Sequence, residues 1–168
     1  MYFEMFGQFK KTLTQMDTWL EMAAEHAKAR AFDPKNYLTL RLAPDQFPFS
    51  RQVQIACDTA KLAASRVTGK DAPSQPDTEA TIEELRARVA SVIKYLDGFN
   101  AKDFDGADTR VVGQPRWEGK IMTGADYFRE HAIPNFFFHS TLVYEILRHS
   151  GVALGKKSFL GTLSLRAQ

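Results

Sequence analysis

The sequence predicts an all-α fold: a four-helix bundle with a short irregular or hairpin insertion before the last helix, followed by a C-terminal tail. In four segments, apolar residues recur at spacings of three and four, as they do on one face of an amphipathic helix. Proline- and glycine-containing stretches separate these segments. A chain of 168 residues fits one domain, taken here as 1–168, and is long enough to bury a core without disulfides.

The first helix is predicted from about Tyr2 to Lys28. Its main apolar stripe consists of Tyr2, Phe6, Phe9, Leu13, Met16, Leu20, Ala24 and Ala27. A second stripe on the far side, Trp19, Met22 and His26, also has to be covered by something. Residues 30–48 contain three prolines and are predicted to be irregular.

The second helix is expected to begin at Pro48 or Phe49, because proline suits the first turn, and to end at Gly69. Its inner face consists of Phe49, Val53, Cys57, Ala60, Ala64 and Val67. The third helix opens with a capping box from Thr81 to Glu84 and ends near Gly98. Its stripe consists of Ile82, Leu85, Val89, Val92, Leu96 and Phe99.

Residues 104–123 show no helical pattern, and two short runs around 113–115 are consistent with a small hairpin. The fourth helix follows Thr123 and Gly124 and ends at Gly151. Because Pro134 lies inside it, we expect a kink, or a break with a restart. The apolar clusters of the tail predict that it folds back over the bundle.

His139 is the most informative residue of the fourth helix. At 100° per residue it shares a face with Asn135 and with apolar residues, so both polar side chains should face the core. A buried imidazole or carboxamide without a partner costs a few kcal/mol. Gln52 of the second helix and Asp17 of the first are candidate partners. These four residues predict either a binding pocket or a polar cluster of purely structural role.

Two aromatic surfaces lie outside these core stripes. One carries Phe137, Tyr144 and Arg148 of the fourth helix, and the other is the second stripe of the first helix. Apolar patches outside a core often mark interfaces, so a homodimer is expected; packing of the tail over them is the alternative.

Composition excludes several classes of partner. The net charge is +2, with 22 basic and 20 acidic residues mixed along the chain, which gives no footprint for nucleic acid or an anionic membrane. No run approaches the ~20 apolar residues that span a bilayer. Cys57 is the single cysteine, and the N-terminus lacks the pattern of a signal peptide, so a cytoplasmic protein is expected. The common zinc motifs and the nucleophile elbow are absent from the sequence.

Three blocks of the sequence resemble a bacterial domain-of-unknown-function family within the DinB/YfiT-like superfamily. They are LRLAPDQFPFSRQVQIACDTAK, TIEELRARVASVIKYL and PNFFFHSTLVYEILRHSGVALGKKSFLG, and the last is the most specific. The resemblance implies a four-helix bundle, commonly dimeric. It also implies a divalent metal held by three histidines, one on the second helix and two spaced four apart on the last. Some members use a low-molecular-weight thiol as cosubstrate.

The sequence departs from this family pattern at the metal ligands. His139 matches the first of the paired histidines, but Val143 stands four residues later, and the second helix contains no histidine. We therefore expect neither a metal site nor a cofactor, since a divalent metal would have an incomplete ligand set. Three functions stay open: a module that binds a small molecule around His139, a metal- or thiol-dependent transferase or hydrolase, and a structural or interaction protein.

Overall fold

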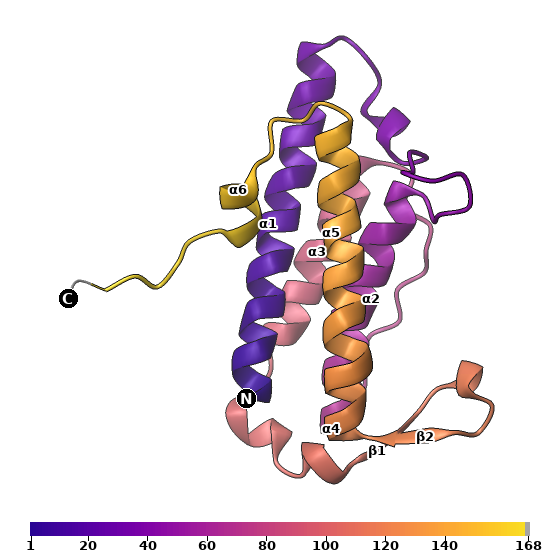
Figure 1. Ribbon diagram of the computed structural model, residues 1–168, viewed down its shortest axis with the longest axis vertical. Helices are drawn as coiled ribbons and strands as arrows, with labels where there is room; N and C mark the ends of the chain where they lie inside the picture. The colour runs from indigo at the N-terminus through magenta and orange to yellow at the C-terminus, as the bar shows by residue number, and fades with distance from the viewer. Residues whose placement is uncertain (167–168) are drawn as a thin grey trace.

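Four long helices lie side by side and form the bundle that the sequence predicts (Figure 1). The computed structural model describes residues 1–166. The long helices are α1 (Tyr2–Ala29), α2 (Phe49–Thr68), α3 (Ile82–Asp97) and α5 (Ile133–His149). Both α1 and α2 pack against α3 and α5, so the helices follow the order α1, α3, α2, α5 around the core. Each helix thus buries its apolar stripe between two neighbours.

Short elements connect the long helices. The strands β1 (Val111–Gly113) and β2 (Ile121–Thr123) pair antiparallel, which confirms a hairpin in this insertion. Its connection is longer than predicted, because residues 116–120 belong to the turn and not to the second strand. The helix α4 (Gly124–Asp126) leads into a π-helical segment, Tyr127–Ala132, and α6 (Lys156–Leu160) lies in the tail. Single 3₁₀ turns occur at Pro34–Tyr37, Ala101–Phe104, Ala107–Thr109 and Pro115–Trp117.

The predicted stripes form the core. Every residue on the predicted inner face of α2 is fully buried, including Cys57, whose pKa is raised to about 12, mainly by desolvation. A thiol with so high a pKa is unreactive at neutral pH. The predicted helix ends are also confirmed. Gly69 ends α2 with a φ of 76°, and Thr81 caps α3 by accepting a hydrogen bond from the backbone N–H of Glu84.

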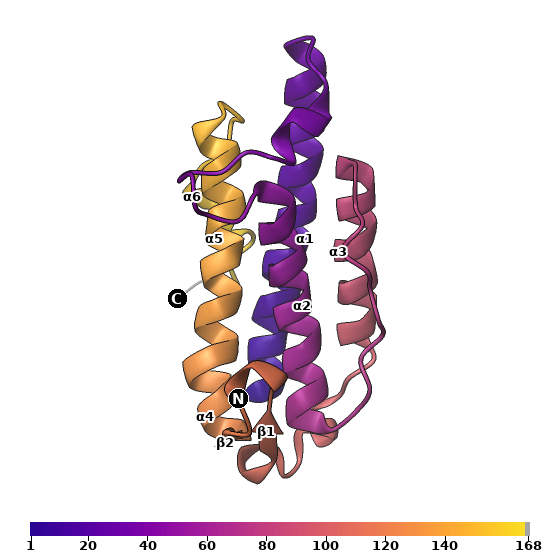
Figure 2. The same ribbon diagram turned by 90° about the vertical axis from the view of Figure 1, so that its right-hand side faces the viewer.

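The expected irregularity at Pro134 appears as the π-helical segment that directly precedes α5. Proline has no N–H, and its ring collides with the carbonyl one turn earlier, so regular α-helical bonding cannot continue through it. Widening the preceding turn accommodates this conflict. At the start of the same helical run, the hairpin leaves the end of the bundle and lies in front of the lower ends of α2 and α5 in Figure 2.

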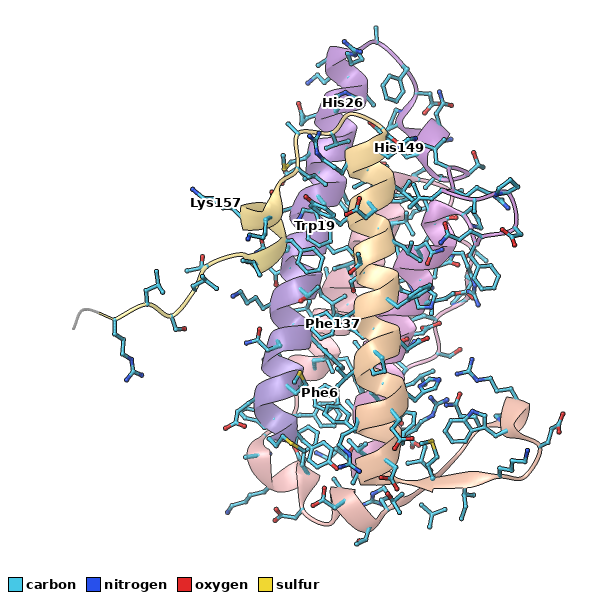
Figure 3. The ribbon with its side chains drawn as sticks, viewed as in Figure 1. Phe6, Trp19, His26, Phe137, His149 and Lys157 are labelled. Atoms are coloured by element: carbon cyan, nitrogen blue, oxygen red, sulfur yellow. The ribbon has the colours of Figure 1, made fainter. Side chains whose placement is uncertain are left out.

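The tail covers Trp19 of the second stripe of α1, whereas His26 of that stripe packs against Phe32 and lies within hydrogen-bond distance of the Tyr37 hydroxyl. The Trp19 indole N–H donates to the backbone carbonyl of Ser158 at 3.1 Å, and its ring stacks on Phe159 with centroids 5.5 Å apart. Tyr144 of α5 packs edge-on against both rings. Figure 3 shows Trp19 on the side of α1 that faces α5 and the tail. Tail packing therefore accounts for Trp19 and Tyr144, and the homodimer stays a prediction that a measurement of molecular mass in solution would test.

No helix within residues 1–166 is long enough and apolar enough to cross a membrane.

Candidate functional site

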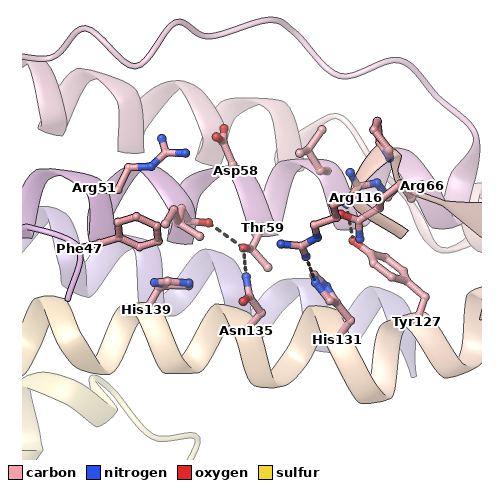
Figure 4. A pocket seen from close by; sticks show the side chains of 14 residues that line it. Phe47, Arg51, Asp58, Thr59, Arg66, Arg116, Tyr127, His131, Asn135 and His139 are labelled. Carbon is pink, nitrogen blue, oxygen red and sulfur yellow. Dashed lines mark hydrogen bonds between the residues drawn. The ribbon is translucent and has the colours of Figure 1, made fainter. Parts of the chain in front are cut away.

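A cavity of about 450 Å³ lies between α2 and α5, a volume within the range of small-molecule sites. The turn of the hairpin closes one end, and Phe47, which precedes α2, borders the other (Figure 4). Its walls come from three parts of the chain: α2 with the segment before it, the hairpin, and the last helical run. From α2 and the segment before it come Phe47, Arg51, Ile55, Asp58, Thr59, Leu62 and Arg66; from the hairpin Gln114, Pro115 and Arg116; and from the last helical run Tyr127, His131, Asn135 and His139.

A chain of hydrogen bonds fixes the orientation and tautomer of His139. The side-chain N–H of Gln52 donates to the backbone carbonyl of Phe47 at 2.9 Å, so the amide oxygen of Gln52 points the other way. That oxygen lies 2.6 Å from Nδ1 of His139. Because a carbonyl oxygen can only accept, Nδ1 carries the proton and Nε2 of the neutral ring is an acceptor. No side chain or backbone group in the range 1–166 forms a hydrogen bond with Nε2 of His139.

Burial keeps the imidazole of His139 neutral. The side chain is 7% exposed, and desolvation, followed by the positive charge of Arg51, lowers its pKa from 6.5 to about 4. A neutral imidazole with a free Nε2 can accept a hydrogen bond at physiological pH. The local environment therefore maintains one defined acceptor inside the cavity.

Asn135 contributes a second acceptor one turn away. Its amide N–H donates to the hydroxyl of Thr59 at 2.7 Å, and that hydroxyl donates in turn to the backbone carbonyl of Ile55. The amide oxygen of Asn135 has no hydrogen-bond partner in the part of the chain that the structure describes. Together with His139, it gives this part of the cavity the character of a hydrogen-bond acceptor.

The hairpin end of the cavity has the opposite character. Arg66 of α2 donates to the hydroxyl of Tyr127 at 3.0 Å, and Arg116 of the hairpin contacts Nε2 of His131. The ring of His131 stacks on that of Tyr127 at 5.4 Å. Burial first, and then the two guanidinium groups, lower the pKa of His131. Figure 4 shows these four side chains grouped at the end opposite His139.

The structure brings together three of the four residues predicted for the pocket. Gln52, Asn135 and His139 meet at the interface of α2 and α5. Asp17 lies elsewhere, because the edge of α1 that carries it faces α3. There it forms two hydrogen bonds with Arg86, at 2.8 and 3.1 Å, and it does not line the cavity.

Other residues of the cavity were missed or set aside by sequence reasoning. Asp58 lines the cavity and pairs with Arg88 and Lys61. The hairpin residues gave no signal because the insertion has no periodicity from which a facing direction could be predicted. The basic residues of α2 gave a weak signal, since Arg51 and Arg66 lie on the same side as Thr59.

These residues do not fit the three-histidine metal site that the superfamily implies. Val143, fully buried, occupies the position of the second paired histidine, and the α2 side chain that faces His139 is Gln52. Within residues 1–166, no three side chains of histidine, cysteine, aspartate or glutamate cluster closely enough to hold a metal ion.

Comparisons with known proteins agree with the fold. A family model described as "Domain of unknown function (DUF1993)" matches residues 1–160. The chain is similar to a DinB family member protein from Shewanella denitrificans, solved by crystallography, with 47% sequence identity and a TM-score of 0.93. That match covers 97% of this chain and 93% of the other. No curated protein matches the sequence. The chain therefore belongs to the DUF1993 family and has the DinB-like helical fold.

Proposed function

We propose that this protein binds a small molecule in the cavity between α2 and α5, with His139 Nε2 as the central hydrogen-bond acceptor. The observation that carries the proposal is the bonded chain from the Phe47 carbonyl through Gln52 to His139. It holds a neutral ring in one tautomer and leaves its second nitrogen facing the cavity. A histidine of purely structural role would be expected to satisfy both nitrogens within the protein.

The acceptor pair defines what this part of the cavity recognises. His139 and Asn135 lie four residues apart, about 6 Å along the helix axis. A ligand with hydroxyl or N–H groups at that separation would satisfy both. Binding would then be supported by direct hydrogen bonds in a partly desolvated site, where such bonds are stronger than in water.

The test is ligand-observed NMR with a set of small hydroxyl- and amide-bearing fragments. We expect some of them to bind the wild type and to lose binding to His139→Phe, which keeps a planar ring but removes the acceptor. His149→Phe is the matched control, because His149 is exposed at the end of the same helix. It should bind the same fragments as the wild type.

Two results would count against this proposal. If no fragment distinguishes His139→Phe from the control, the acceptor is not part of a binding site. If, in addition, His139→Phe strongly lowers the free energy of unfolding, the bond to Gln52 serves to fix the register of α2 against α5, and the role of His139 is structural.

A further inference from the structure

Two guanidinium groups at the hairpin end of the cavity have no acidic partner. Every salt bridge among the described residues involves other cations, and neither Arg66 nor Arg116 takes part in one. By contrast, Arg51 at the far end pairs with Asp77. Asp58, the one carboxylate that lines the cavity, is engaged by Arg88 and Lys61. The hairpin end therefore carries uncompensated positive charge.

Two further donors at this end are buried without an acceptor. Arg116 can only donate, so the Nε2 atom of His131 that it contacts must accept, and the proton of the neutral ring lies on Nδ1. This Nδ1 is buried and has no partner, and the same holds for the side-chain nitrogen of Gln114. Both residues line the cavity. Buried donors without acceptors are costly in the free protein, and an acceptor supplied by a ligand would relieve that cost.

We propose that this end of the cavity is an anion subsite, formed by Arg66, Arg116, His131 and Gln114, for a carboxylate or phosphoryl group of the ligand. The inference rests on the proposed function and specifies its ligand class: a small acid with a hydroxyl or N–H group at the end that reaches His139. Guanidinium groups match the paired oxygens of carboxylates and phosphates, and a neutral N–H donor adds a bond without a counter-charge. The chemistry shared by both ligand types is an anionic oxygen pair.

Trp117 is a natural reporter of this subsite. Its ring lies edge-on to His131 with centroids 5.8 Å apart, next to Arg116 in the hairpin turn. We would titrate the protein with sodium phosphate and, separately, with sodium acetate at constant ionic strength maintained with sodium chloride, following tryptophan emission. We expect a saturable change with at least one of these anions and none with chloride alone. Comparing the two anions shows whether a phosphoryl or a carboxylate group is preferred.

Variants locate the binding. Arg116→Gln should weaken binding of the effective anion by about tenfold or more, as expected for one charge-assisted hydrogen bond. Lys120→Gln removes the same charge from an exposed position of the same hairpin outside the cavity, and it should leave the affinity unchanged. Arg66→Gln should behave like Arg116→Gln, with circular dichroism confirming that each variant is folded. In Trp117→Phe the emission change should disappear while calorimetry still detects binding.

The subsite is refuted if neither anion saturates by fluorescence or calorimetry. It is also refuted if Arg116→Gln and Lys120→Gln weaken binding equally, because the effect would then be diffuse attraction. Its failure can be distinguished from that of the proposed function. Fragments that require His139 but are unaffected by Arg116→Gln would leave the proposed function standing and remove the anion subsite. Anion binding that requires Arg116, with no fragment sensitive to His139→Phe, would support the anion subsite and remove the proposed role of His139.

Discussion

Lowering the pH should destabilise this protein through His139 in a window that its carboxylates leave nearly undisturbed. The pKa of His139 is about 4 in the folded protein and 6.5 when the ring is fully solvated. Between these values the unfolded chain binds more protons than the folded one, so stability falls as the pH falls and levels off below about pH 4. His139 is only 7% exposed, so its lowered pKa acts almost in full on stability. The difference in proton binding between the folded and unfolded chains then lowers the free energy of unfolding by about 2 kcal/mol between about pH 7 and about pH 5.

The assay is urea unfolding followed by far-UV circular dichroism at both pH values, with the free energy of unfolding extrapolated to water. His139→Phe has no titrating ring at this position, so its free energy of unfolding should fall by about 2 kcal/mol less than that of the wild type across the same pH interval. His131 also has a lowered pKa, so comparing the two proteins isolates the contribution of His139. The control variant His149→Phe should lose as much free energy of unfolding as the wild type over the same pH interval. If His139→Phe shows the same loss as the wild type, the neutral, desolvated imidazole described above is wrong.

Two further predictions concern the scaffold, and each uses a matched pair. The side chain of Arg88 is 2% exposed and binds three carboxylates, so Arg88→Met should lower the free energy of unfolding by about 3–5 kcal/mol. Arg86 lies on the same helix but is 34% exposed, so Arg86→Met should lower it by about 1 kcal/mol or less. Urea unfolding would measure both variants, and equal losses would contradict the reasoning. A Cβ on Gly124 would lie 1.9 Å from the carbonyl oxygen of Ala107, so Gly124→Ala should destabilise by about 1–3 kcal/mol. Gly7→Ala, in open space on α1, should stabilise by about 0.5–1 kcal/mol, and thermal melts that show both variants shifted the same way would contradict this.

The fold could be predicted from the sequence because periodicity and caps act locally. The α2 stripe, Gly69 and the capping residue Thr81 each express a local preference that the structure keeps. The same periodicity placed His139 and Asn135 on one inward face. It could not identify which helices would be neighbours. Asp17 therefore met Arg86 of α3 rather than the cavity, since a direction on a helical wheel does not specify a partner.

The positive end of the cavity could not be predicted for a different reason. Arg116 and Gln114 reach it from a hairpin whose direction depends on how the chain leaves the bundle. His131 lies eight residues before His139, and eight residues on an ideal α-helix end 80° away from the starting direction. Counting on a regular helix therefore turns His131 away from the direction of His139, and no sequence signal links the two histidines to one cavity.

The π-helical segment Tyr127–Ala132 makes the composition of the cavity depend on chain length as well as on residue identity. A π turn bonds each residue to the fifth rather than the fourth along, so it contains one residue more than an α turn. One residue corresponds to about 100° of rotation about the helix axis. Deleting a single residue in this segment would therefore rotate Tyr127 and the base of the hairpin away from α2 while leaving His139 and Asn135 in place. A related chain could keep every residue of the acceptor end and yet lose the positive end through one deletion, so the two ends can change independently.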